Sequence, residues 1–83
     1  MELANLDEKI TIHFKKHIKH IEDALYTLIK RGQDIGDITP WRDPRSLARS
    51  MLASAQGMIV ISKINSSPEI LSDIATTALT SLD

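Results

Sequence analysis

The chain has 83 residues, no cysteine, and a formal net charge of -1 from 10 basic and 11 acidic residues. This near-neutral charge gives no general attraction to nucleic acid or anionic membranes, and the lack of cysteine excludes disulfides and thiolate metal sites. A domain this short hides only about 60% of the surface that its unfolded chain exposes, so it usually needs a supplement to its own core. With disulfides excluded, we expect that supplement to be a partner subunit.

Hydrophobic residues make up 42% of the chain and charged residues 25%. These are the proportions of an ordered globular domain, and we expect residues 1–83 to form a single one. The amino-terminal sequence MELANLDEK is acidic, and no run of about 18 apolar residues follows it. Neither a signal peptide nor a membrane span is predicted, so a soluble cytoplasmic protein is the expectation.

The first predicted element is a long amphipathic helix. At roughly 100° per residue its apolar side chains fall within an arc of about 140°. These residues are Leu3, Leu6, Ile10, Phe14, Ile18, Ile21, Ala24, Leu25, Leu28 and Ile29. Asn5 with Glu8 three positions later has the pattern of a capping box. Gly32 is the predicted stop, because glycine readily takes the left-handed conformation after a last turn.

The segment from Gly32 to Arg42 carries two glycines and a proline, which predicts a turn-rich linker. Ile35, Ile38 and Trp41 are its apolar side chains, and we expect them to fold back onto the helices. Trp41 could instead close a ligand pocket. We favour a role in anchoring the linker, because an ordered linker needs buried aromatic area.

Two matching start signals predict the second and third helices. Asp43 followed by Pro44, and Ser67 followed by Pro68, each place a capping side chain before a proline at the first helical position. The predicted helices cover residues 44–65 and 68–82. No alternating run typical of a strand occurs, so the predicted fold class is all-α, with three helices.

Apolar or small side chains cover most of the circumference of the second helix. One stripe consists of Leu47, Ala48, Met51, Leu52, Ala55, Met58 and Ile59. A second stripe consists of Ser50, Ala53, Ser54, Gly57, Val60, Ile61 and Ile64. Only a narrow polar strip separates them, at Arg45, Arg49, Gln56 and Lys63. A helix of this kind must be covered on most sides, which a three-helix unit of this size cannot do alone.

Gly57 is the residue that indicates close approach of another helix. Glycine in a helix interior costs roughly 1 kcal/mol relative to alanine, so a packing reason is expected. The approaching helix could belong to the same chain or to a second copy, and we favour the second copy. Two helices from each copy would then form a four-helix dimer interface with two-fold symmetry. The predicted interface residues are Ser50, Ala53, Ser54, Gly57, Ile61, Ile64, Ile70, Leu71, Ile74 and Ala78.

From Arg31 onward the chain resembles the closing region of TetR-family transcriptional regulators. A glycine-containing turn leads to the sequence D-P-x-x-L-A, and a Gln56–Gly57 pair follows mid-helix, before the apolar run MIVI and Lys63. A short Ser-Ser-Pro break then precedes a final helix that ends in A-L-x-x-L, at Ala78, Leu79 and Leu82. Each motif is weak alone, but their order and spacing over about fifty residues make the resemblance fairly specific.

In that family the last two long helices form the dimer interface, and a helix-turn-helix headpiece binds operator DNA. A small, often apolar effector binds between these two parts. The resemblance implies that this chain is a fragment of a longer repressor that contributes homodimerisation and one wall of an effector pocket. The candidate wall residues are His17, Tyr26, Met51 and Met58. DNA binding would depend on a headpiece that this chain lacks.

Metal binding and catalysis find little support in the sequence. His13, His17 and His20 share one side of the first helix, but four neighbouring lysines disfavour a divalent ion, and a polar boundary between core and solvent is the better interpretation. The basic run HFKKHIKH is interpreted as a solvated face. No phosphate loop or nucleophile pattern occurs, so we expect neither an enzyme nor a cofactor. The alternative to a TetR-like fragment is a stand-alone helical dimerisation, adaptor or antitoxin-like protein.

Overall fold

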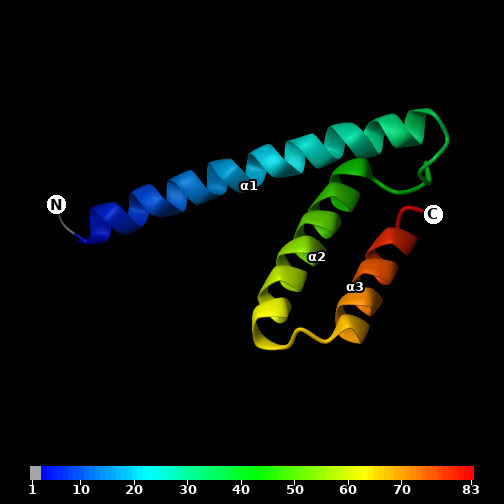
Figure 1. Ribbon diagram of the computed structural model, residues 1–83. Helices are drawn as coiled ribbons and strands as arrows, with labels where there is room; N and C mark the ends of the chain where they lie inside the picture. The colour runs from blue at the N-terminus through cyan, green and yellow to red at the C-terminus, as the bar shows by residue number, and fades with distance from the viewer. Residues whose placement is uncertain (1–2) are drawn as a thin grey trace.

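The computed structural model describes residues 3–83, with side chains from residue 5 onward. This part of the chain forms three helices and no strand, which confirms the all-α prediction. The helices are α1 (Leu3–Asp34), α2 (Pro44–Ile64) and α3 (Pro68–Thr80). Figure 1 shows α2 and α3 as an antiparallel hairpin, with α1 running across the amino-terminal end of α2. None of these described helices is long and apolar enough to cross a membrane.

The predicted capping box at Asn5 and the predicted stop of α1 at Gly32 are both wrong. The helix begins at Leu3, so Asn5 lies inside the first turn and does not precede it. At the other end α1 continues past Gly32 to Asp34. The helix closes with a Schellman motif, in which the Asp37 N–H donates to the Gly32 carbonyl at 2.8 Å and the Gly36 N–H donates to the Gln33 carbonyl at 3.2 Å.

Gly36 is therefore the glycine that ends the helix, since its φ of 87° lies in the left-handed region. Gly32 serves a different purpose. A Cβ built at Gly32 would lie 2.5 Å from Cδ1 of Ile38, so glycine there leaves room for the linker side chain to pack on the helix.

Polar contacts hold the linker between α1 and α2. Ile38 folds back onto the core as predicted, but Ile35 is 68% exposed and Trp41 is 90% exposed, so the predicted anchoring role of Trp41 is wrong. Anchoring comes from Gln33 and Thr39. The side-chain amide of Gln33 donates to the carbonyls of Thr39 and Arg42, and the N–H of the buried Thr39 donates to the Leu82 carbonyl at 2.8 Å.

The predicted start of α2 is confirmed. Asp43 is extended and its carboxylate accepts a hydrogen bond from the Ser46 N–H at 2.8 Å, with Pro44 as the first helical residue. The start of α3 at Pro68 is also confirmed, but Ser67 makes no side-chain capping bond. Instead, the Ser67 N–H donates to Oδ1 of Asn65 at 3.1 Å.

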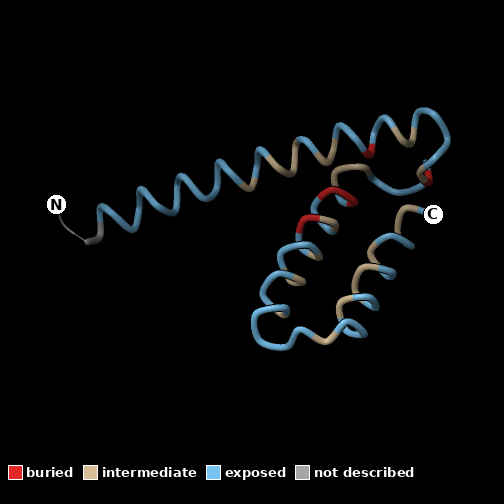
Figure 2. The backbone as a smooth tube through the Cα atoms, in the orientation of Figure 1, coloured by how far each residue is buried: buried red, intermediate tan, exposed pale blue. Residues whose placement is uncertain are grey.

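The core is small and lies where α1 crosses α2 (Figure 2). Its buried apolar residues are Ile29, Leu47, Ala48 and Leu52. Ala48 is fully buried, and its small side chain lets α1 approach the α2 backbone closely. Partly buried side chains surround this centre, namely Leu25, Tyr26, Ile38, Met51 and Leu82. Leu82 packs the end of the chain against the core, so the end of α3 is held beside the start of α2.

Ion pairs hold α1 against α2 beside this core. Arg45 of α2 contacts Oδ1 of Asp23 at 2.7 Å and Oε1 of Glu22 at 3.2 Å, and its guanidinium lies 4.3 Å from the centre of the Tyr26 ring. Arg49 adds a second contact to Glu22 at 2.9 Å. The hydrogen bond from Arg45 is the main reason that the pKa of Asp23 lies below its ordinary value.

The three helices form one layer. The molecule measures 52 × 32 × 13 Å, and its smallest dimension is about the diameter of one helix with its side chains. Its radius of gyration is 15.9 Å, against about 12 Å for a compact domain of this length. The accessible surface is 6412 Å², against about 5,000 Å² for a compact protein of 9.3 kDa. About 1,400 Å² of extra surface therefore stays open on each chain.

Replacement of Gly36 by alanine tests the helix ending. We expect Gly36→Ala to lower the free energy of unfolding by about 1–2 kcal/mol, because a Cβ disfavours the left-handed conformation. Gly36→Asn is the matched control and should cost less, since asparagine tolerates this region. Urea denaturation followed by circular dichroism measures both changes. Equal losses for the two variants would contradict the assigned role of Gly36.

Acidification tests the carboxylates of Asp23 and Asp43, whose pKa values are both lowered by hydrogen bonds, from Arg45 and Ser46 respectively. An aspartate whose pKa is lowered by folding stabilises the folded chain at pH values above its unfolded-state pKa of about 3.9. This stabilisation is lost as the pH falls through the folded-state pKa. We expect the melting temperature to decrease as the pH is lowered below about 4. The Asp23→Asn, Asp43→Asn double variant should show a flatter acid limb, and an unchanged limb would contradict this account.

Candidate functional site

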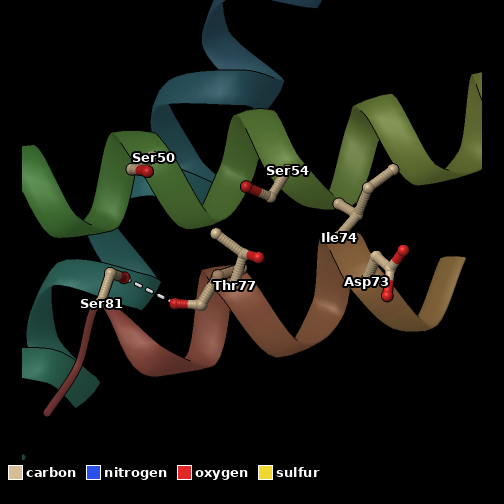
Figure 3. A pocket seen from close by; sticks show the side chains of 7 residues that line it. Ser50, Ser54, Asp73, Ile74, Thr77 and Ser81 are labelled. Carbon is tan, nitrogen blue, oxygen red and sulfur yellow. Dashed lines mark hydrogen bonds between the residues drawn. The ribbon is translucent and has the colours of Figure 1, made fainter. Parts of the chain in front are cut away.

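Four of the predicted interface residues lie between α2 and α3 of the same chain. Ser50 and Ser54 face Ile74 and Ala78 across the hairpin, as the close view in Figure 3 shows for the labelled side chains. Together with Asp73, Thr77 and Ser81 they line an open groove of about 430 Å³. Ser50 and Ser54 therefore face the chain's own α3, which is the same-chain alternative that the sequence left open.

A second group of residues points away from α3 and is open to solvent. At roughly 100° per residue, Ala53, Gly57, Val60 and Ile64 share an arc of about 60° on α2. Val60 is 57% exposed and Ile64 is 83% exposed. A Cβ built at Gly57 would meet nothing within 4 Å, so no helix of this chain approaches closely there. We call these four residues the small-residue face.

The other predicted interface residues border the small-residue face or the inside of the hairpin. Ile70 of α3 is 39% exposed, while Ile61 and Leu71 are half-buried. The structure thus divides the predicted set between contacts inside the hairpin and a free surface beside it. The free surface is the part that a second molecule could reach.

An apolar hollow lies on the opposite side of the hairpin. Met51 and Met58 point roughly 160° away from Ala53 and Val60 around α2. With Ala55 and with Ala75, Ala78 and Leu79 of α3 they line an open hollow of about 180 Å³, in which Ser54 is the only polar side chain. We call this hollow the methionine groove. Both sides of the hairpin therefore present apolar surface.

The four candidate residues for an effector-pocket wall do not form one site. Met51 and Met58 lie together in the methionine groove. Tyr26 packs on the core beneath Arg45, and His17 is exposed on the part of α1 that extends beyond the hairpin. Of the four, only the two methionines share a surface that a ligand could contact.

The histidines of α1 show no metal-binding geometry. His13, His17 and His20 are exposed, and no group of three or more histidine, aspartate or glutamate side chains converges among the described residues. These histidines border an exposed apolar stripe of α1. The predicted boundary between core and solvent is therefore wrong at these histidines, because the apolar stripe beside them is itself exposed to solvent.

The sequence did not single out the Arg45 ion pairs or the polar side of the hairpin groove. Arg45 and Arg49 were interpreted only as a polar strip, and their partners lie more than twenty residues earlier in the chain. Asp73, Thr77 and Ser81 belong to the polar flank of α3 and carry no motif. Their positions depend on how α3 packs, which spacing within one helix does not reveal.

Taken together, these surfaces offer apolar contact and a few hydroxyl groups. The side chains that line the two hollows include one charged group, the Asp73 carboxylate. Such surfaces suit packing against another helix or an apolar molecule. Comparison of the chain with protein-family models, with curated proteins and with solved structures finds no match.

Proposed function

We propose that this chain is a non-catalytic self-association region, the dimerising part of a TetR-like transcriptional regulator, which also contributes one wall of an effector site. The observation that carries the proposal is the open single layer. About 1,400 Å² of surface beyond that of a compact protein stays exposed on each chain. Two copies that bury this surplus against each other would cover about 2,800 Å², which is in the range of permanent homodimer interfaces.

The small-residue face is the surface proposed for the partner. Gly57 lies in open space at its centre, with apolar side chains on either side along α2. A second hairpin related by a two-fold axis would bring its own Gly57 to the same region, and small residues allow the helix backbones to approach closely. The result is a bundle of four helices, two from each copy. The motif order from Asp43 to Leu82 that resembles the TetR family supports the same arrangement.

The methionine groove is proposed as the part of an effector site that this chain contributes. Its volume of about 180 Å³ is smaller than the roughly 300–1,000 Å³ of typical ligand pockets, and it is open on one side. Methionine side chains adapt to apolar ligands of varied shape. The groove therefore suits one wall of a pocket whose other wall comes from a different segment. DNA recognition is assigned to a separate headpiece of the regulator.

The mass of the chain in solution tests self-association. We expect light scattering after size exclusion to give at least twice the monomer mass of 9.3 kDa at micromolar concentrations. The measurement should be repeated over a dilution series, since the apparent mass of an associating chain falls with concentration. A monomer throughout the series would overturn the proposed function.

Two leucine substitutions on α2 locate the interface. Gly57→Leu fills open space in the single chain but should obstruct a closely packed partner, at an overpacking cost of about 1–3 kcal/mol, which is roughly a five- to 150-fold rise in the dissociation constant. Gln56→Leu places the same side chain one residue away on the exposed polar strip and should leave association nearly unchanged. If both variants associate like the unmodified chain, Gly57 is not at the interface.

A further inference from the structure

A third, mostly apolar surface lies on α1, away from the hairpin. Its six residues alternate in spacing between four and three positions, and they are Ile10, Phe14, His17, Ile21, Ala24 and Leu28. We call them the α1 seam. Alternation of four and three is a seven-residue repeat, which is typical of helices that wind around another helix.

The α1 seam does not take part in the chain's own core. Leu25, Tyr26 and Ile29 are the residues by which α1 contacts the core, and the seam lies roughly 100° further around the helix. Ile10 is 57% exposed, and Phe14 and Leu28 are each 59% exposed. Figure 1 shows the amino-terminal half of α1 extending beyond the hairpin, and Figure 2 shows that half as exposed. More than half of the Ile10 and Phe14 surface there is left exposed by the described residues.

Charged residues of opposite sign continue the same spacing at both ends of the α1 seam. Asp7 lies three positions before Ile10, and Arg31 lies three positions after Leu28. Both side chains are exposed, and neither takes part in an ion pair among the described residues. The seam thus has an acidic end and a basic end.

We propose that the α1 seam pairs with α1 of a second copy in the antiparallel direction. One register places Asp7 opposite the partner's Arg31 at each end. The same register sets Ile10 against the partner's Leu28, and it sets the large Phe14 against the partner's small Ala24. His17 then faces the partner's Ile21 near the centre. Charge and side-chain volume therefore select the same alignment.

The parallel direction fits worse. It would place each Asp7 against the partner's Asp7 and each Arg31 against the partner's Arg31, and like charges in such positions are destabilising. It would also stack Phe14 on the partner's Phe14 and leave Ala24 beside the partner's Ala24. The antiparallel direction also lays the projecting half of one α1 along the half of the other that carries the hairpin.

Among the helices of the chain, α1 is the one that can cover the seam. The seam spans about 27 Å, whereas α3 with 13 residues reaches only about 20 Å. α2 is long enough as a whole, but two of its sides contact α1 and α3, and its open side, from Ala53 to Ile64, spans only about 17 Å. A second copy of α1 has the length, the period and the complementary charges.

This proposal deepens the proposed self-association and rests on the chain pairing with copies of itself, but it uses a surface separate from the small-residue face. If both surfaces are used in two-fold pairs, the smallest closed assembly holds about four chains. If only the α1 seam is used, the assembly is a dimer that does not depend on Gly57.

Cysteine crosslinking tests the pairing directly, because the chain contains no cysteine of its own. Ile10→Cys and Leu28→Cys chains are mixed and oxidised in a thiol–disulfide buffer. Both positions are exposed in the single chain, so the substitutions should not disturb its fold. We expect a covalent heterodimer from the mixture and little covalent dimer from Ile10→Cys alone. Predominant self-crosslinking of Ile10→Cys would overturn the antiparallel direction.

Glu8→Cys and Lys30→Cys form the matched control pair. They lie at the same levels along α1 but on the side opposite the α1 seam, and both residues are exposed. The control mixture should give at least several-fold less covalent dimer than the seam mixture. Equal yields would overturn the proposal, as would the absence of a covalent dimer from the seam mixture. If the seam mixture gives no covalent dimer but light scattering still shows a dimer, the proposed function stands and a different molecule covers the α1 seam.

A charge exchange tests the register. Asp7→Lys or Arg31→Glu alone should weaken association several-fold, because each places like charges together at both ends of the pair. The double variant carries the charges exchanged and should recover most of the lost association. If the double variant associates as weakly as either single variant, or more weakly, the register is wrong. Repeating the series in a Gly57→Leu background separates this surface from the small-residue face.

Discussion

The crossing of α1 over α2 is the contact on which the rest of the structure depends. Ala48 is fully buried there, between Ile29 of α1 and the neighbouring Leu47, and its small side chain lets the two helices approach closely. Leu82 reaches the same core from the end of the chain, where the Thr39 N–H bonds to its carbonyl. The α2–α3 hairpin is therefore closed at the crossing, and the short connection between α2 and α3 lies at its far end (Figure 1). Arg45 and its carboxylate partners lie beside the apolar contact and link α2 to α1.

A crossing of two helices with a hairpin attached gives a layer one helix thick. Each helix in such a layer has two open sides, so apolar residues that would enter the core of a thicker domain remain on the surface. This explains why the hairpin presents the small-residue face on one side and the methionine groove on the other, and why the α1 seam is exposed. The proposed self-association, the proposed effector wall and the proposed α1 pairing are three ways to cover surface that this chain leaves open.

The features that could be predicted from the sequence are those settled within a few residues. Asp43–Pro44 and Ser67–Pro68 mark helix starts because a cap and a proline act on the next turn alone. Predictions failed where one residue type can serve either of two structural roles. Gly32 has the residue type of a helix stop but serves to admit Ile38, while Gly36 takes the left-handed conformation. Trp41 has the residue type of an anchor, yet the buried Thr39 and the amide of Gln33 hold the linker with hydrogen bonds.

The sequence by itself determined the fold class and two helix starts, because period and capping are properties of a single helix. Only the tertiary structure decided which helix packs against each apolar face of α1 and α2. It divided the ten predicted interface residues between the hairpin interior, where Ser50 and Ser54 face α3, and the open surface around Gly57. It also separated His17 and Tyr26 from the two methionines. Spacing along a helix gives the direction of each side chain relative to its neighbours, but the position of the other helices around it depends on contacts between residues far apart in the chain.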